Sequence, residues 1–120
     1  MEKVEKFVKE VYNSLVKEDE EVYRDLFNNT DINDDIIPYW KDALKLYSKL
    51  SDNDREIFFK VIKQITIDTI SSLFGIIDGC TTIDDKGIEP KLLLGEQDTE
   101  GELLDLFLAY VEEIEQMEEK

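Results

Sequence analysis

The sequence contains no histidine, and this absence removes a large group of catalytic mechanisms. Histidine is the usual general base for serine and cysteine nucleophiles and the commonest zinc ligand. Serine-histidine and cysteine-histidine catalysis are therefore excluded. A small enzyme that uses carboxylates with a bound metal is the catalytic class that remains. We expect the chain not to be an enzyme and to need no cofactor.

Cysteine is nearly absent as well. The single cysteine, Cys80, allows no internal disulfide, which is consistent with a reducing compartment, and we expect a cytoplasmic location. A reactive thiol needs a cationic or histidine partner, and the nearest base in the sequence is Lys86. We expect Cys80 to be a buried or half-buried structural residue.

Glycine clusters and long apolar runs are also missing. The five glycines stand singly, so the sequence has no glycine-rich phosphate loop. The longest apolar zone, from Ile65 to Ile77, contains Asp68 and is too short to span a bilayer. The start, from Met1 to Lys6, is charged and leads into no continuous apolar stretch, so we expect no signal peptide.

Basic residues are few compared with acidic ones: 14 Lys and Arg stand against 30 Asp and Glu, a net charge of −16. Residues 66–120 hold 15 acidic and 3 basic residues and therefore carry −12 of that charge. Such a field repels phosphate backbones and anionic lipids and attracts basic proteins. We expect a basic protein partner, with no direct nucleic-acid binding and no membrane binding.

The length of 120 residues and the 42% share of hydrophobic residues predict one acidic helical domain over residues 1–120. Apolar residues at three- and four-residue steps predict a first helix with this stripe: Val4, Phe7, Val8, Val11, Tyr12, Leu15 and Val16. Asp19 is a candidate cap for a second helix that ends at Asn28 and Asn29. The pattern leaves open whether the two helices are continuous.

Pro38 suits the first turn of a third helix. Its predicted apolar face comprises Trp40, Ala43, Leu44, Tyr47 and Leu50. Ser51, with Asp54 three residues later, predicts the start of a long fourth helix. Asp78 and Gly79 provide its stop, because glycine tolerates the left-handed conformation that commonly ends a helix.

The fourth helix is apolar nearly all round after Ile65, as expected for a central helix. Its predicted buried stripe comprises Phe58, Val61, Ile62, Ile65, Thr69, Leu73 and Ile76. Of these we expect Phe58, Val61, Ile62, Ile65 and Leu73 to belong to the core, together with Phe107 of the last helix. The β-branched residues from 65 to 68 leave a strand as the alternative there.

Asp68 is the most interesting single acid, because burial in this apolar zone would raise its pKa. We favour a structural role over a catalytic one: Asp68 lies at the rim of the core or bonds a neighbouring hydroxyl such as that of Thr69 or Ser72.

β-Branched residues on both sides of a turn at Asp84 to Gly87 predict a short hairpin near residues 80–94. Pro90 cannot donate to a ladder, so the second strand is an edge or starts after it. A last helix follows, with an apolar seam at Leu103, Phe107, Tyr110, Ile114 and Met117. The predicted fold is mainly α: four or five helices packed around a central long helix, with a small β-hairpin before the last helix.

The segment from Asp31 to Asp42 has some features of a calcium loop. Asp31, Asn33, Asp35 and Asp42 occupy positions 1, 3, 5 and 12 of such a loop. However, position 6 is Ile36, where the sharp turn needs glycine, and position 12 is Asp, where a bidentate Glu is usual. We therefore expect no calcium site and no other metal site.

The last helix is the strongest candidate for a binding surface. Its acidic residues in the final turns oppose the partial negative charge of a helix C-terminus, and few nearby bases offset them. A solvated polar face is the alternative interpretation. The predicted partner-binding residues are Glu102, Asp105, Glu112, Glu113 and Glu115.

The stretch from Asp68 to Gly79, followed by the predicted hairpin and then by residues 103–107 (Leu-Leu-Asp-Leu-Phe), resembles small uncharacterised bacterial proteins of the kind found as immunity partners of secreted toxins. The resemblance covers about a third of the chain and implies a protein that neutralises a partner by binding it. We expect an acidic inhibitor or immunity-type protein that blocks a basic partner such as a nuclease toxin. The alternative is a regulatory or structural subunit that pairs through its C-terminal helix, as a homodimer or with another protein.

Overall fold

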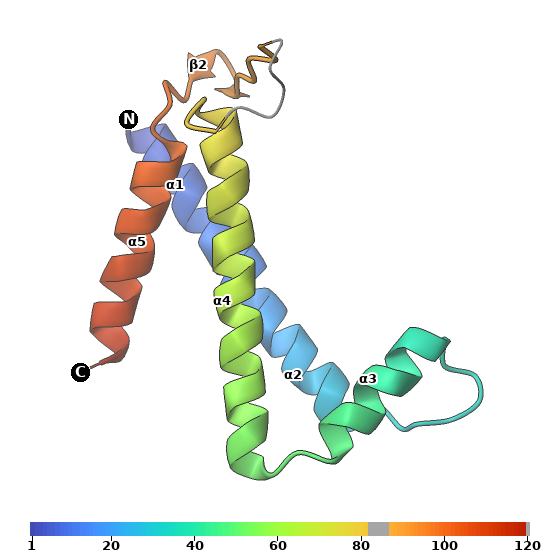
Figure 1. Ribbon diagram of the computed structural model, residues 1–120. Coiled ribbons are helices and arrows are strands. Elements are labelled where there is room, and N and C mark those ends of the chain that lie inside the picture. The colour runs from blue at the N-terminus through green and yellow to red at the C-terminus, as the bar shows by residue number, and fades with distance from the viewer. Residues whose placement is uncertain (82–86, 120) are drawn as a thin grey trace.

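The computed structural model describes residues 1–81 and 87–119. The described chain is mainly helical, and a small antiparallel hairpin precedes the last helix, so the predicted fold class is confirmed (Figure 1). The elements in chain order are α1 (Glu2–Val11), η1 (Tyr12–Glu18), α2 (Asp19–Asn29), α3 (Pro38–Ser48), α4 (Asp52–Ile77), β1 (Leu93–Leu94), β2 (Gln97–Asp98) and α5 (Leu103–Glu118).

The first three of these elements form one continuous helical rod. The backbone stays in the right-handed helical region through Tyr12 and Asp19, and η1 is a stretch of wider π-type winding between two α-helical parts. Asp19 is therefore a helical residue, and its predicted role as a cap is wrong. The end of the second helix at Asn29 is confirmed, because Thr30 is already extended.

Local signals fix both ends of α4. The Ser51 side chain accepts a hydrogen bond from the backbone N–H of Asp54 at 3.1 Å, which confirms the predicted cap. Gly79, at φ +83°, follows the last turn in the left-handed conformation that favours glycine. Residues 65–68 lie inside the helix, so the strand alternative is wrong. The start of α3 at Pro38 is also confirmed.

The side chain of Asp78 links the end of α4 to the start of α5. Its carboxylate oxygens accept hydrogen bonds from the backbone N–H groups of Leu103 and Leu104, at 3.3 and 2.7 Å. Glu102, the N-terminal flanking residue of α5, makes no such bond with its own side chain. A residue 25 positions earlier in the chain thus caps α5 and fixes where it begins.

The hairpin lies later in the sequence than expected. Leu93 pairs with Asp98 and Leu94 with Gln97, around a turn that starts at Gly95 with φ +65°. The predicted turn at residues 84–87 lies largely outside the described residues. The start of β1 after Pro90 agrees with the expected effect of that proline.

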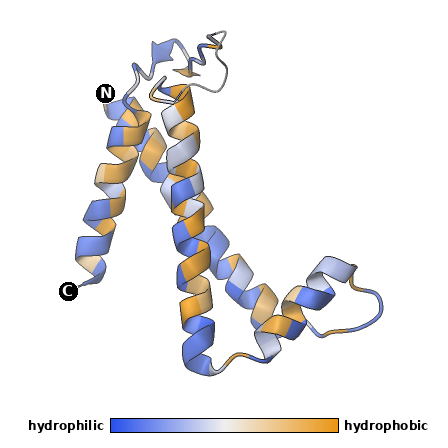
Figure 2. Ribbon diagram, in the orientation of Figure 1, coloured by the Kyte–Doolittle hydropathy of each residue, from blue (hydrophilic) through white to orange (hydrophobic). Residues whose placement is uncertain are grey.

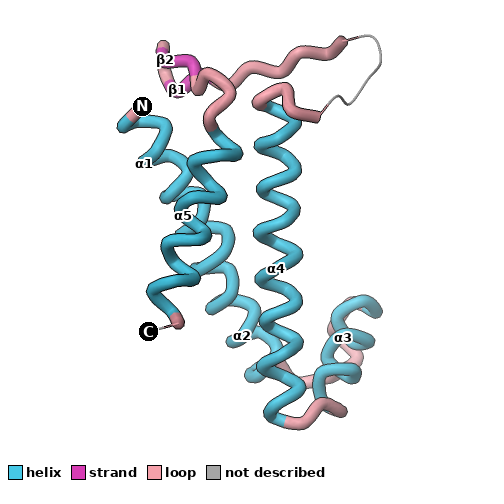
Figure 3. The backbone as a smooth tube through the Cα atoms, turned by 60° about the vertical axis from the view of Figure 1, so that its left-hand side comes forward, coloured by secondary structure: helices cyan, strands magenta, loops and turns pink. Residues whose placement is uncertain are grey.

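Two hydrophobic clusters lie at opposite ends of α4. Figures 1 and 3 show the helices that contribute to them, with α5 beside the second half of α4 and α3 beside its start. The larger one joins α1, η1, the second half of α4 and α5, and it consists of Val4, Val8, Tyr12, Val16, Ile67, Ile70, Phe74, Leu103, Phe107 and Val111. The smaller one joins α2, α3 and the first half of α4, and it consists of Phe27, Leu44, Tyr47 and Phe59. Helix α4 is thus the central element that both clusters share.

The buried side of α4 differs from the predicted one. Val61, Ile65 and Leu73 are 52%, 58% and 53% exposed, and Phe58 and Ile62 are only partly buried. The core side instead carries Phe59, Ile67, Ile70, Phe74 and Gly75. The prediction for Phe107, which is fully buried, is confirmed. Polar and apolar residues are interspersed along α4 (Figure 2), and apolar ones occur on both its buried and its exposed sides, so the sequence pattern does not reveal which side its neighbours cover.

Candidate protein-binding surfaces

The predicted partner-binding residues lie together on the solvent-exposed side of α5. Asp105, Glu112, Glu113 and Glu115 are exposed, and Glu102 is partly exposed at the start of the helix. At 3.6 residues per turn they span about half of the helix circumference, opposite the side that packs on α1 and α4. We call this set of five residues the acidic face.

Little positive charge offsets the acidic face. No Lys or Arg lies between residues 103 and 118. Among the described residues, the ion pair that reaches α5 joins Lys63 Nζ to Glu118 Oε2 at 3.4 Å, and Glu118 is not part of the face. Glu112 also accepts a hydrogen bond at 3.5 Å from the side chain of Gln116, a neutral residue outside the face. The carboxylates are therefore free to interact with a cationic partner.

The apolar seam of α5 is mostly occupied within the chain itself. Leu103 and Phe107 are fully buried, and Tyr110 and Ile114 pack against the larger cluster. The Tyr12 ring meets the Tyr110 ring edge to face, with 5.3 Å between the ring centroids. Met117, at the end of the seam, is exposed. Pairing of α5 with another helix through this seam would require separation from α1.

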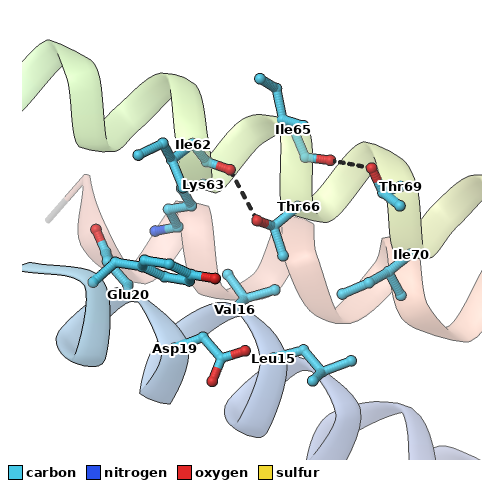
Figure 4. Close-up of a pocket in the computed structure, with 11 residues that line it drawn as sticks. Leu15, Val16, Asp19, Glu20, Ile62, Lys63, Ile65, Thr66, Thr69 and Ile70 are labelled. Atoms are coloured by element: carbon cyan, nitrogen blue, oxygen red, sulfur yellow. Dashed lines mark hydrogen bonds between the residues drawn. The ribbon is translucent and has the colours of Figure 1, made fainter. Parts of the chain in front are cut away.

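A second surface lies between α4 and the η1–α2 rod, where the two elements enclose a groove of about 330 Å³ (Figure 4). We call it the α4 groove. Its lining residues are Leu15, Val16, Asp19, Glu20, Tyr23, Ile62, Lys63, Ile65, Thr66, Thr69 and Ile70. Part of the α4 stripe that we predicted to be buried therefore forms one wall of an open groove.

The polar side chains on the α4 wall are mostly satisfied by their own helix. The Thr66 hydroxyl donates to the Ile62 carbonyl at 2.9 Å, and the Thr69 hydroxyl donates to the Ile65 carbonyl at 2.8 Å (Figure 4). Neither hydroxyl proton is left for a ligand. Apart from Lys63, the α4 wall therefore presents mainly aliphatic and methyl groups to the groove.

Lys63 is the basic residue in this lining, and neighbouring groups stabilise its positive charge. Burial by itself lowers the pKa of Lys63, but Tyr12 and the carboxylates of Glu118 and Glu20 outweigh burial and raise it overall. Its ammonium group lies 3.4 Å from Glu118. This ion pair thus joins Lys63 of α4 to Glu118 at the C-terminal end of α5.

The groove continues along α4 toward α3. A second cavity, of about 340 Å³, shares Tyr23 and Ile62 with the first. Its other lining residues are Phe27, Tyr39, Trp40, Ala43, Leu46 and Phe58, and none of them is charged. Tyr39 and Leu46 are more than half exposed. The two cavities therefore adjoin at Tyr23 and Ile62, and we call the pair, whose lining is mainly apolar, the channel.

Two further candidate residues have, among the described residues, no neighbours that suggest chemistry; Lys86, the base nearest to Cys80 in the sequence, lies outside the described residues. Asp68 is exposed and accepts a hydrogen bond from Gln64 at 2.9 Å, so the predicted bond to Thr69 or Ser72 is wrong. Cys80 is exposed in the turn after α4, so the prediction of a buried or half-buried cysteine is also wrong. The turn places Cys80 beyond the last core residue of α4.

The segment from Asp31 to Asp42, which has some features of a calcium loop, is stabilised by contacts among its own polar groups. The Asn33 side chain accepts a hydrogen bond from the backbone N–H of Asp35 at 2.8 Å, and Lys41 pairs with Asp34 at 3.3 Å. Within residues 1–81 and 87–119, no group of three or more Cys, Asp or Glu residues is arranged to hold a metal ion. No helix in the same ranges is both long and apolar enough to cross a membrane.

Comparison of the chain with protein-family models, with curated proteins and with solved structures gives no match. The resemblance to immunity-type proteins therefore stays a prediction from the sequence.

Proposed function

We propose that the chain is a non-catalytic binding protein that neutralises a basic protein partner by covering its positively charged site with carboxylates. The observation that carries the proposal is the acidic face of α5, whose exposed side chains have no basic residue on the same helix. A nuclease toxin is the kind of partner that fits, because an enzyme that holds a phosphate backbone needs a positive groove. Carboxylates would compete for the same charges.

The arrangement of α5 supports this proposal over helix pairing. Glu112, Glu113 and Glu115 lie in the C-terminal half of their helix, where carboxylates oppose the helix dipole, and none of them takes part in an ion pair among the described residues. The apolar seam, in contrast, already packs inside the chain through Leu103 and Phe107. The side of α5 that faces solvent is charged, which suits fast electrostatic encounter more than tight apolar association.

Affinity capture with the intact chain at low salt, followed by mass spectrometry, would identify the partner, and a repeat at high salt would test the role of charge. We expect a basic protein that is retained at low salt and depleted at high salt. If that protein is a nuclease, a stoichiometric amount of the chain should inhibit it. An acidic partner would contradict the proposal.

Association kinetics with the captured partner would test the acidic face itself. Replacing Glu112, Glu113 and Glu115 together by Gln should slow association at low salt by roughly tenfold and change dissociation much less. The melting temperature should not fall, because repulsion at the helix end is relieved.

A matched control removes the same charge elsewhere. Asp31, Asp34 and Asp35 lie in the loop between α2 and α3, far from α5 (Figure 1). Their replacement by Asn should slow association less than the α5 variant does. Equal slowing by both variants would mean that total charge matters and the acidic face does not, and the unmodified rate in the α5 variant would refute the proposal.

A further inference from the structure

Both walls of the α4 groove carry large apolar side chains that the chain leaves uncovered. On α4, Ile65 lies at the rim of the groove and is 58% exposed, and Figure 4 shows its side chain turned away from the opposite wall. On the opposite wall, Leu15 of η1 is 43% and Tyr23 of α2 is 39% exposed. The floor between them is formed by Val16 and Ile70, which are buried. A gathering of exposed apolar residues around a hollow is typical of a surface that binds another molecule.

The length of the channel fits a helix. The α4 residues that line the two cavities run from Phe58 to Ile70, which corresponds to about 18 Å along the helix axis. A helix of about three turns has this length. An amphipathic helix that lays its apolar stripe between two other helices is a recurring mode of peptide recognition. Tyr23 and Ile62, shared by both cavities, lie where the middle of such a helix would contact the channel.

The charge at the channel selects the kind of helix. Asp19 lines the groove and is exposed, and it takes part in no ion pair among the described residues. Glu20 is the second carboxylate in the lining, and it pairs with Arg24 at 3.4 Å. The one ammonium in the lining, that of Lys63, lies against Glu118. Carboxylates beside an apolar channel favour an occupant with apolar residues on one side and Lys or Arg on the other.

The same charge argues against a second copy of this chain as the occupant. Each copy carries a net charge of −16. Two chains of the same charge repel one another, and like charges across an interface suppress pairing. A basic partner gains the attraction that a second copy would have to overcome.

We infer that the channel formed by the α4 groove and the adjoining cavity against α3 binds a basic amphipathic helix of about three turns. The inference rests on the proposed function to the extent that the partner is basic. It assigns the apolar part of the contact to the channel, whereas the acidic face provides long-range attraction.

Three labelled peptides of 14 residues would test the inference by fluorescence anisotropy against the intact chain. The first contains Leu at helical positions i, i+3, i+4, i+7, i+8 and i+11 and Lys elsewhere. The second has the same composition with the Leu residues dispersed around the helix, and the third has Glu in place of Lys. We expect the first to bind at least about tenfold more tightly than the second, and the third not to bind. Equal binding of the first two would show that charge alone acts and would overturn the inference.

A pair of matched variants on α4 would locate the peptide. Ile65→Asn changes an exposed residue at the rim of the groove, and Ile57→Asn changes one that is 48% exposed on the same helix and lines neither cavity. Ile65→Asn should weaken binding of the first peptide about tenfold or more, because an aliphatic side chain that becomes buried contributes at least that factor. Ile57→Asn should bind like the unmodified chain. Circular dichroism would verify that both variants keep their helix content.

The same variants separate this inference from the proposed function. If Ile65→Asn binds both the peptide and the captured partner normally, while the α5 variant slows association with that partner, the channel proposal fails and the acidic-face proposal stands. If Ile65→Asn loses the peptide and the α5 variant associates with the captured partner at the unmodified rate, the channel proposal stands and the acidic-face proposal fails. Sedimentation that shows a dimer whose interface is lost in Ile65→Asn would assign the channel to a second copy and overturn the inference.

Discussion

At the scale of single residues, Asp78 has the clearest structural role. It ends α4 and accepts two backbone hydrogen bonds from the first turn of α5, through Leu103 and Leu104. A carboxylate at a helix N-terminus also interacts favourably with the helix dipole. One side chain thereby sets the position of α5, and with it the direction in which the acidic face points.

Replacing Asp78 by Ala should lower the free energy of unfolding by about 1 to 2 kcal/mol, as the loss of a helix N-cap usually does. Urea denaturation followed by circular dichroism would measure the change. Asp68→Ala is a suitable control, because Asp68 is exposed and bonded only to Gln64 of its own helix among the described residues. The control should differ from the unmodified chain by less than about 0.5 kcal/mol. Equal effects of the two substitutions would contradict the capping role.

At the scale of elements, α4 shows what the sequence could and could not predict. Its ends were predictable, since Ser51 and Gly79 act through local hydrogen bonding and backbone conformation. Its buried side was not, because apolar residues occur on more than one side of the helix and neighbours decide which of them are covered. Ile65 was expected in the core for this reason, whereas Phe59, which is 2% exposed, was not.

The two sides of α4 should respond very differently to truncation. Phe59→Ala removes a buried ring of the smaller cluster and should destabilise the chain by about 3 to 5 kcal/mol. Ile65→Ala removes atoms that mostly face water and should change stability by less than about 0.5 kcal/mol. Thermal unfolding of both variants would measure the difference. A large loss for Ile65→Ala would mean that the groove is closed in the free chain.

The hairpin and the acidic face also differ in how far the sequence alone could predict them. The hairpin was expected around Gly87, because that glycine lies between β-branched segments, but the chain turns at Gly95. Leu94 of β1 packs against the larger cluster, a contact that the local sequence pattern does not reveal. The acidic face was predictable because it needs no neighbour: Glu112 and Glu115 are exposed on a helix without bases. The α4 groove was not, since it depends on how η1 and α2 cross α4.

At the scale of the whole molecule, the chain is unusually open for its length. Its Cα radius of gyration is 17.9 Å, compared with about 14 Å for a typical compact domain of this size. The cause is the division of the core into two clusters at opposite ends of α4. This shape leaves the α4 groove and the acidic face of α5 accessible at the same time.

The free chain exposes its apolar channel and its acidic face, so that a partner can cover them. Small-angle X-ray scattering from the dilute chain tests this exposure, because it gives both size and mass. We predict a radius of gyration close to 17.9 Å and the mass of a single 14.1 kDa chain. A radius near 14 Å would show that the chain closes over its own channel, and a doubled mass would show that the free chain pairs with a second copy; either result is incompatible with an open single chain.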